Sequence, residues 1–426
     1  MLKAIQKKFS SRLGHDVVWT FTIQILIMFC SFAINKLLAN RLSIDDYGQY
    51  NVIKRSVQVI SFIMLAGVGI TLPRYIPIYR NSTPPRKIAP FLFASMIYII
   101  GVSLAVVVVC TLFSAQMQTI IIGQEGNISL FLVALAYAFT LAIAQFAFAY
   151  YRGIGDFKSY NGSQLAMQFL IVLPLVMLPM LTISKVFISW LIITSLLVAC
   201  IFIKELWIII QKRGSIKSET PIKSHLLTII KYSSGRLVAD FFQYSLATFP
   251  LIYISKVNGL QDTAYFSVGI TFVSMVVPLF IFMGIILLPY VSENIAQNNI
   301  MKANHLISRL QIIYIVSSLF VIIILLFFTA PLTKLFFANE YMPSLNQTRI
   351  MTLAILPQAL YMLYRTPIDA VSVIPYNAII LGICIVVMFV CFKFSSTLDH
   401  YAYAYLVVST LQGFLSCFTW HLLKKI

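Results

Sequence analysis

Long uncharged apolar segments follow one another along almost the whole of this 426-residue chain. A helix needs about 20 predominantly apolar residues to cross the hydrocarbon core of a bilayer, and these segments are long enough. Overall, 60% of the residues are hydrophobic and only 10% are charged. The sequence therefore predicts an all-α polytopic membrane protein.

We place about twelve transmembrane helices along the chain. The basic N-terminus precedes an apolar run that is too long for a signal peptide and lacks a small-residue cleavage site, so we interpret that run as a retained first span. No connecting loop is long enough to hold a separate soluble domain. The predicted spans are residues 17–39, 52–73, 90–112, 129–151, 162–182, 186–209, 229–254, 264–289, 310–329, 347–368, 373–392 and 400–422.

The strongly basic character of the chain indicates an orientation. The formal net charge is +18, and most of the 31 Lys and Arg residues fall on the same side of the twelve-span scheme as both termini. Cytoplasmic loops of membrane proteins are enriched in Lys and Arg. We therefore expect a multi-pass protein with both termini in the cytoplasm, and no nucleic-acid partner.

The most polar and basic segment, QKRGSIKSETPIKSH at 211–225, divides the predicted spans six and six. Leu42 to Tyr47 in the first half is echoed by Leu260 to Tyr265 in the second, which supports a parallel duplication. The prediction is an N-terminal six-helix lobe at 1–210, a basic cytoplasmic linker at 211–228 and a C-terminal six-helix lobe at 229–426.

One polar stripe stands out in the seventh predicted span. Ser233, Arg236, Asp240 and Gln243 follow one another at steps of three, four and three residues, which places them on one helical face. A charge near the bilayer centre costs at least about 2.5 to 3.5 kcal/mol, so it is usually kept where it faces a cavity or a partner. Two interpretations stay open: Arg236 binds a substrate, or Arg236 and Asp240 form a pair that holds two helices together.

Other predicted spans also carry polar residues close to one face. Gln24 and Lys36 lie in the first span, and Lys54, Arg55 and Gln58 lie in the second. Together with the stripe they leave an excess of positive charge, which would concentrate an anionic cargo. The candidate cavity residues are Arg236, Asp240, Gln243, Lys54, Arg55, Lys36, Gln24 and Gln58.

Other polar features receive structural interpretations. A spacing of four residues at the end of the tenth span predicts a local ion pair between Arg365 and Asp369. The six cysteines lie in apolar spans without CxxC spacing, and the five histidines are scattered, so we expect no metal site. No phosphate-binding loop motif occurs, which argues against ATP hydrolysis by this chain. We expect no cofactor and no catalytic residues, and a coupling ion, Na+ or H+, stays open.

The N-terminal region resembles a known family. The segment Leu42 to Tyr50, followed by Gly67-Val68-Gly69 and Leu72-Pro73-Arg74-Tyr75, resembles the start of the Wzx-type polysaccharide flippases. These belong to the multidrug, oligosaccharidyl-lipid and polysaccharide flippase superfamily, with the lipid II flippase and the multidrug and toxin extrusion antiporters. The resemblance implies two six-helix lobes around a central V-shaped cationic cavity lined by the first, second, seventh and eighth spans.

The resemblance also implies a cargo. It would be an undecaprenyl-pyrophosphate-linked oligosaccharide, such as an O-antigen, capsule or exopolysaccharide repeat unit, moved across the bacterial inner membrane by alternating access. Membrane lipids and the lipid-linked glycan are then the partners, polysaccharide polymerase and chain-length machinery are further candidates, and we expect a functional monomer.

Two alternatives belong to other functional classes. A cation-coupled drug or metabolite antiporter on the same architecture would use Asp240 as its ion site, but a pump for cationic cargo needs a net acidic cavity. A membrane enzyme, such as a polysaccharide polymerase, tends to carry its catalytic groups on sizeable extramembrane loops. The loops predicted on the non-cytoplasmic side are short, so we expect a transporter rather than an enzyme.

Overall fold

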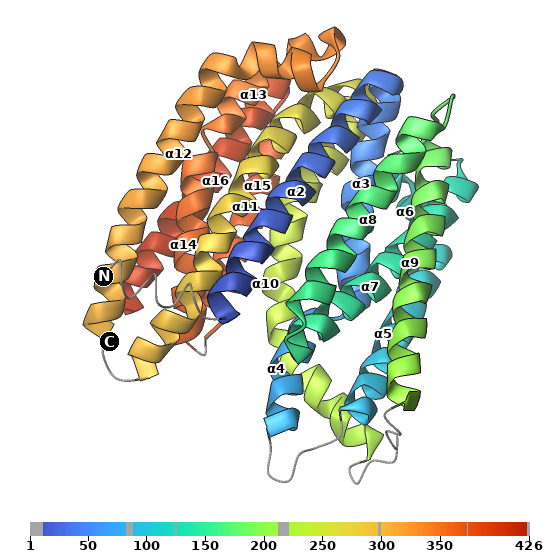
Figure 1. Cartoon of the computed structure of the whole chain (residues 1–426). Helices are drawn as coiled ribbons and strands as arrows, with labels where there is room; N and C mark the ends of the chain where they lie inside the picture. The colour runs from blue at the N-terminus through green and yellow to red at the C-terminus, as the bar shows by residue number, and fades with distance from the viewer. Residues whose placement is uncertain are drawn as a thin grey trace. The chain divides into compact units, whose positions relative to one another are not determined.

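The computed structural model describes residues 12–81, 88–123, 126–211, 221–296, 300–372 and 374–423, and all the secondary structure in these ranges is helical (Figure 1). In chain order the elements are α2 (Arg12–Arg41), α3 (Ile44–Leu65), α4 (Val68–Asn81), α5 (Ala89–Leu112), α6 (Ser114–Ile121), α7 (Ile128–Ile154), α8 (Phe157–Met177), α9 (Ile183–Gln211), α10 (Ile222–Val257), α11 (Leu260–Ala296), α12 (Ile300–Phe336), the 3-10 helix η1 (Asn339–Ser344), α13 (Leu345–Thr352), α14 (Ile355–Val371), α15 (Tyr376–Lys393) and α16 (Leu398–Leu423).

Within the described ranges, eleven helical segments are long and apolar enough to cross a membrane. This confirms the predicted all-α polytopic class. The tenth predicted span, 347–368, falls on α13 and α14, which are separate helices. The backbone breaks at Leu353 and Ala354, whose N–H groups donate to carbonyls only three residues back, at 3.2 and 2.9 Å.

The chain forms two compact units. Unit 1 consists of Met1–Leu42 and Ile53–Leu237, and unit 2 consists of Ser43–Val52 and Val238–Ile426. These units are not the same as the predicted lobes, because Ser43–Val52 groups with the C-terminal helices and the first part of α10 groups with the N-terminal ones. Of the predicted linker, residues 212–220 lie outside the described residues, and α10 begins at Ile222.

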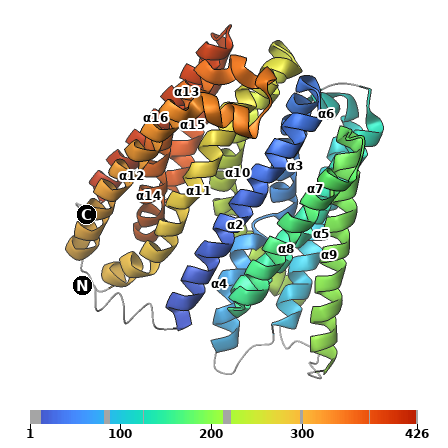
Figure 2. The same cartoon turned by 45° about the horizontal axis from the view of Figure 1, so that its top comes forward.

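Unit 1 is built around α7, which packs against α4, α8 and α9 (Figure 2). The buried face of α7 is rich in small side chains, among them Ala134, Ala138, Ala142 and Ala147. Helices in lipid associate through close van der Waals packing, and small residues let their backbones approach. This composition explains why α7 lies inside the unit, whereas α5 exposes most of its aliphatic side chains, as a lipid-facing helix does.

The second predicted span is divided between α3 and α4. Ala66 and Gly67 between them have positive φ angles of 52° and 75°, a conformation that glycine adopts without steric cost. A Cβ atom on Gly67 would lie 2.7 Å from Cβ of Ser233, so the break also lets α10 come close. The sequence Ala-Gly-Val-Gly thus makes a bend where hydropathy alone predicts a continuous helix.

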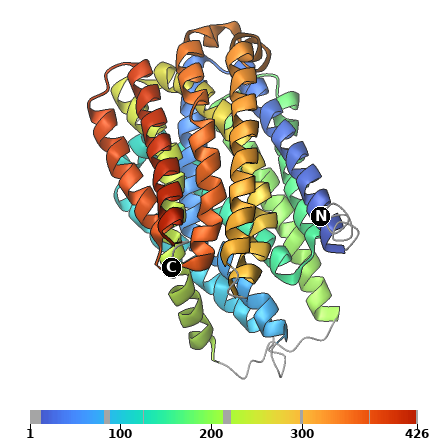
Figure 3. The same cartoon turned by 90° about the vertical axis from the view of Figure 1, so that its left-hand side faces the viewer.

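Unit 2 has one large apolar core. Helix α14 packs against α11, α12 and α16, and α15 packs against α16 (Figure 3). Tyr361, Leu363 and Tyr364 of α14 are buried in this core together with Tyr401 and Trp420 of α16. The outer helix α12 exposes large apolar side chains, including Phe320 and Phe327. Helix α14 is therefore the central helix of unit 2, and its polar side chains are positioned by the packing around it.

Candidate functional site

The polar stripe of α10 is divided between the two units. Ser233 is buried in unit 1, where its hydroxyl lies 3.0 Å from Oγ1 of Thr71. One residue earlier, the hydroxyl of Tyr232 accepts a hydrogen bond of 2.9 Å from Arg74 Nη1, and the Arg74 guanidinium carbon lies 4.5 Å from the Tyr232 ring centroid. Ser233 therefore helps to attach α10 to α4.

Arg236 stands next on the stripe. Its backbone belongs to α10, but its side chain lies outside the described residues. Its proposed contact with a substrate, and its alternative pairing with Asp240, both stay predictions.

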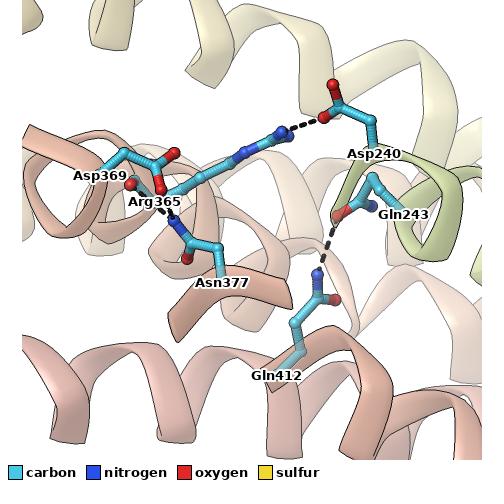
Figure 4. A network of polar contacts seen from close by, with 6 residues as sticks. All are labelled: Asp240, Gln243, Arg365, Asp369, Asn377 and Gln412. Atoms are coloured by element: carbon cyan, nitrogen blue, oxygen red, sulfur yellow. Dashed lines mark hydrogen bonds and ion pairs between the residues drawn. The ribbon is translucent and has the colours of Figure 1, made fainter. Parts of the chain in front are cut away.

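Asp240 forms an ion pair with Arg365 of α14 in unit 2 (Figure 4). Nη2 of Arg365 donates to Oδ1 of Asp240. The Arg365 side chain is 28% exposed and the Asp240 side chain 19% exposed, so neither group is sealed inside the core. Pairing lowers the cost of placing both charges in a membrane-spanning region. Among the described side chains, the partner of Asp240 therefore lies on another helix, α14.

The predicted ion pair between Arg365 and Asp369 is wrong, because these two described side chains do not form a salt bridge. Instead Asn377 of α15 donates from Nδ2 to Oδ1 of Asp369 at 2.8 Å and to the backbone carbonyl of Arg365 at 3.0 Å. Asn377 is itself buried. Figure 4 shows the carboxylate of Asp369 near Asn377, while the Arg365 guanidinium extends the other way to Asp240.

Gln243 lies one helical turn beyond Asp240 on the same face of α10. Its Oε1 accepts a hydrogen bond of 3.3 Å from Nε2 of Gln412, on α16. Gln412 is buried and Gln243 is partly buried. The structure thus brings a guanidinium, a carboxylate and two amides together from three helices of unit 2, as Figure 4 shows.

The polar residues of the first predicted span form a second set of contacts, in unit 1. Nε2 of Gln24 donates to Oε1 of Gln164 at 2.8 Å. One turn away, Nδ2 of Asn161 donates to Oγ1 of Thr20 at 2.8 Å. Both pairs join α2 to α8. At least part of the polar face of α2 therefore holds a neighbouring helix, and Gln24 already has a partner within the protein.

The remaining predicted site residues lie in unit 1. Lys54, Arg55 and Gln58 are partly buried on α3, and Lys36 on α2 is exposed. Arg55 and Gln58 are three residues apart, so they share a helical face. These positions are consistent with contacts to a charged ligand, but no contact in the structure assigns that role to them.

Four residues of the unit 2 network in Figure 4 were not predicted as members of the site: Arg365, Asp369, Asn377 and Gln412. Each is a polar residue within a mainly apolar helix, and that signal was present in the sequence. The spacing could not reveal their partners, because Asp240 and Arg365 are 125 residues apart and Gln243 and Gln412 are 169 apart. Within the described part of the chain, no three His, Cys, Asp or Glu residues gather as metal ligands would.

Comparison with known proteins identifies the family. Residues 13–295 match the family model described as "Polysaccharide biosynthesis protein". No curated protein sequence matches the chain. Several solved structures share its fold at low sequence identity.

One of them is an inward-facing multidrug resistance MATE family transporter of the MOP superfamily, with a TM-score of 0.73 and 12% identity over 96% of this chain and 98% of that chain. The lipid II flippase MurJ, in an inward closed conformation, has a TM-score of 0.68 and 14% identity over 95% of this chain and 87% of its own. The Vibrio cholerae MATE transporter VcmN in its bent form has a TM-score of 0.66 and 14% identity over 97% and 98%. These identities establish a common fold. Because the family model covers more than half of the sequence, the chain belongs to the family of polysaccharide biosynthesis proteins.

Proposed function

We propose that the protein is a flippase that moves an undecaprenyl-pyrophosphate-linked oligosaccharide across the bacterial inner membrane by alternating access. The observation that carries this proposal is the match to the polysaccharide biosynthesis family on a fold that a lipid II flippase also has. The O-antigen, capsule and exopolysaccharide repeat units are the candidate cargoes. The transporter works as a monomer with both termini in the cytoplasm, and it delivers its cargo to polysaccharide polymerase and chain-length machinery.

In this proposal the cationic side chains bind the pyrophosphate or acidic sugars. Lys54 and Arg55 are partly buried within a membrane-spanning segment, and charged residues in such segments often mark a substrate pathway. An arginine fork bonds two phosphate oxygens at once, so Arg55 and Arg236 suit a pyrophosphate. Gln58 and Gln243 would contact sugar hydroxyls or water. A V-shaped cationic cavity and a coupling ion remain part of the proposal.

A complementation experiment tests the proposed cargo contacts. The variants Arg55→Ala and Arg236→Ala are expressed in a strain that lacks its own flippase and carries the matching polysaccharide genes. We expect each variant to restore much less surface polysaccharide than the unaltered protein at equal membrane level. Arg349→Ala, which removes an exposed positive charge from α13, is the matched control and should restore it fully. Normal polysaccharide with both variants would contradict these roles.

Because MATE transporters share the fold, a drug antiporter is the second candidate. It would use Asp240 as an ion site and export organic cations. In the structure Asp240 already has a cationic partner, Arg365, which favours anionic over cationic cargo near this helix. Efflux of an organic cation that depends on Asp240 would favour the antiporter. Product formation by the purified chain from lipid-linked sugar would instead favour an enzyme.

A further inference from the structure

The guanidinium of Arg365 uses little of its hydrogen-bonding capacity. Arg has five N–H donors in a planar fork. Its Nη2 donates to Asp240, and the guanidinium makes no other hydrogen bond to a described residue. The side chain is 28% exposed, so the protein does not enclose it fully. Arg365 thus has donors left for a further acceptor.

The neighbouring acidic group does not take those donors. Asp369 lies one helical turn from Arg365, at a spacing that favours an ion pair. Its carboxylate is instead bound by Asn377, which also holds the Arg365 carbonyl. Asn377 therefore fixes the backbone of Arg365 and engages the competing carboxylate on α14. Within the described residues, Asp240 is the counter-ion of Arg365.

The contact between Arg365 and Asp240 is exchangeable in principle. It joins two partly exposed side chains from different helices by a single hydrogen bond, whereas an arginine can bind a carboxylate or phosphate with two parallel bonds. An arriving oxyanion that uses both arms of the fork would make more bonds than Asp240 makes. Gln243 lies one helical turn from Asp240 and is bonded to Gln412 in Figure 4, and the amides of these two residues match the hydroxyls of a sugar.

We propose that Arg365 binds an anionic group of the cargo and that Asp240 is a resting counter-ion, which leaves Arg365 when that group arrives. This inference rests on the proposed transport of an anionic glycan. The ligand chemistry is an oxyanion, either the phosphate of a prenyl pyrophosphate or the carboxylate of an acidic sugar. Asp240 then acts as a built-in competitor, which keeps Arg365 neutralised when no cargo is bound.

A binding experiment separates this role from a purely structural ion pair. The full-length protein is purified in a neutral detergent, and binding of geranyl pyrophosphate is measured by microscale thermophoresis, with uncharged geraniol as the reference. Asp240→Asn removes the competing charge, so we expect geranyl pyrophosphate to bind at least about fivefold more tightly, a typical size for coupling within a protein. Arg365→Gln should weaken binding by a similar factor, and Arg365→Lys, which keeps the charge but loses the fork, should lie between.

Two controls accompany these variants. Arg349→Gln makes the same charge change at an exposed position in unit 2 and should bind as the unaltered protein does. Size-exclusion profiles and melting temperatures establish that each variant is folded. If Asp240→Asn does not stay monodisperse, Asp240→Ser, which is smaller and keeps a hydrogen-bond acceptor, takes its place. A second series with digalacturonic acid tells whether the preferred oxyanion is a phosphate or a sugar carboxylate.

The outcomes distinguish the exchange at Arg365 from the proposed anionic cargo on which it rests. Tighter binding after loss of the Asp240 charge, together with weaker binding in Arg365→Gln, supports the exchange. Unchanged or weaker binding in a folded Asp240→Asn protein, or unaltered binding in Arg365→Gln, overturns it while leaving an anionic cargo intact. If the unaltered protein does not prefer geranyl pyrophosphate over geraniol and does not bind digalacturonic acid, the proposed cargo class fails and the role of Arg365 fails with it.

Discussion

Arg41 closes the C-terminal end of α8. Its guanidinium donates to the carbonyls of Leu175, Leu178 and Pro179 at 2.5, 2.8 and 3.2 Å. The last carbonyls of a helix have no partner within the helix, and a cation there also interacts favourably with the helix dipole. The side chain at the end of α2 therefore satisfies the end of a helix that lies 134 to 137 residues later in the chain.

We predict that Arg41→Ala destabilises unit 1. Hydrogen bonds to a charged group contribute about 1.5 to 3 kcal/mol, and partial exposure of Arg41 places the expected loss at the lower end of that range. The measurement is the melting temperature of the purified protein in detergent, which should fall. Lys393→Ala removes an exposed positive charge at the end of α15 and serves as the control. Equal melting temperatures for the two variants would show that the carbonyl contacts contribute nothing.

Single-residue roles were predictable only in part. The sequence placed Asp240 and Gln243 on one polar face, and the structure shows both in the same network. It did not give their partners, because helical spacing identifies neighbours only within one turn or two of the same helix. For Arg365 that rule predicted Asp369, whereas the buried amide of Asn377 takes this carboxylate. Whether Arg365 pairs with Asp369 or with Asp240 depends on how α10, α14 and α15 pack against one another. A local sequence pattern carries no information about that packing.

At the scale of helices, prediction from sequence was more successful. Lipid offers the backbone no hydrogen-bond partners, so an apolar segment of sufficient length has to be helical. The breaks between α3 and α4 and between α13 and α14 were not predicted, because the spans were placed from the length of apolar segments and not from backbone geometry. Ala66 and Gly67 have positive φ angles, and hydropathy carries no information about such a local backbone conformation. The break at Leu353 lies four residues before Pro357, which has no N–H for the Leu353 carbonyl and whose ring would clash with it in a continuous helix, so this proline is the local signal that marks the break.

Gly413 sets the distance between α14 and α16, the central contact of unit 2. A Cβ atom at this position would lie 2.6 Å from the Pro357 carbonyl oxygen and 3.0 Å from its Cα, both backbone atoms. Overpacking of this kind typically costs about 1 to 3 kcal/mol. We predict that Gly413→Ala lowers the melting temperature. Gly162→Ala on α8 is the matched control, because a Cβ there meets nothing within 4 Å, and it should be neutral or stabilising. A Gly413→Ala protein as stable as the control would mean that α16 can shift freely.

At the scale of the whole molecule, the distribution of Lys and Arg predicts the orientation in the membrane. We expect alkaline phosphatase, which is active only outside the cytoplasm, to be inactive when fused after Ile426. The same enzyme inserted after Leu181, between α8 and α9, should be active. Green fluorescent protein fused at the same two sites should give the reverse pattern. Phosphatase activity at the C-terminus would invert the proposed topology.

The grouping of α10 has a consequence for fragments of this protein. Its first part contributes Tyr232 and Ser233 to contacts in unit 1, while Asp240 and Gln243 contribute to unit 2. The beginning of α3 belongs to unit 2, although it precedes most of unit 1 in the sequence. There the ring of Tyr47 packs against Phe337 and Tyr341, with centroid distances of 6.2 and 5.4 Å. A fragment ending before residue 212 would lack the first pair of residues, and a fragment starting at residue 221 would lack Tyr47. Each sequence half therefore completes the other, and neither half contains all the parts of an autonomous folding unit.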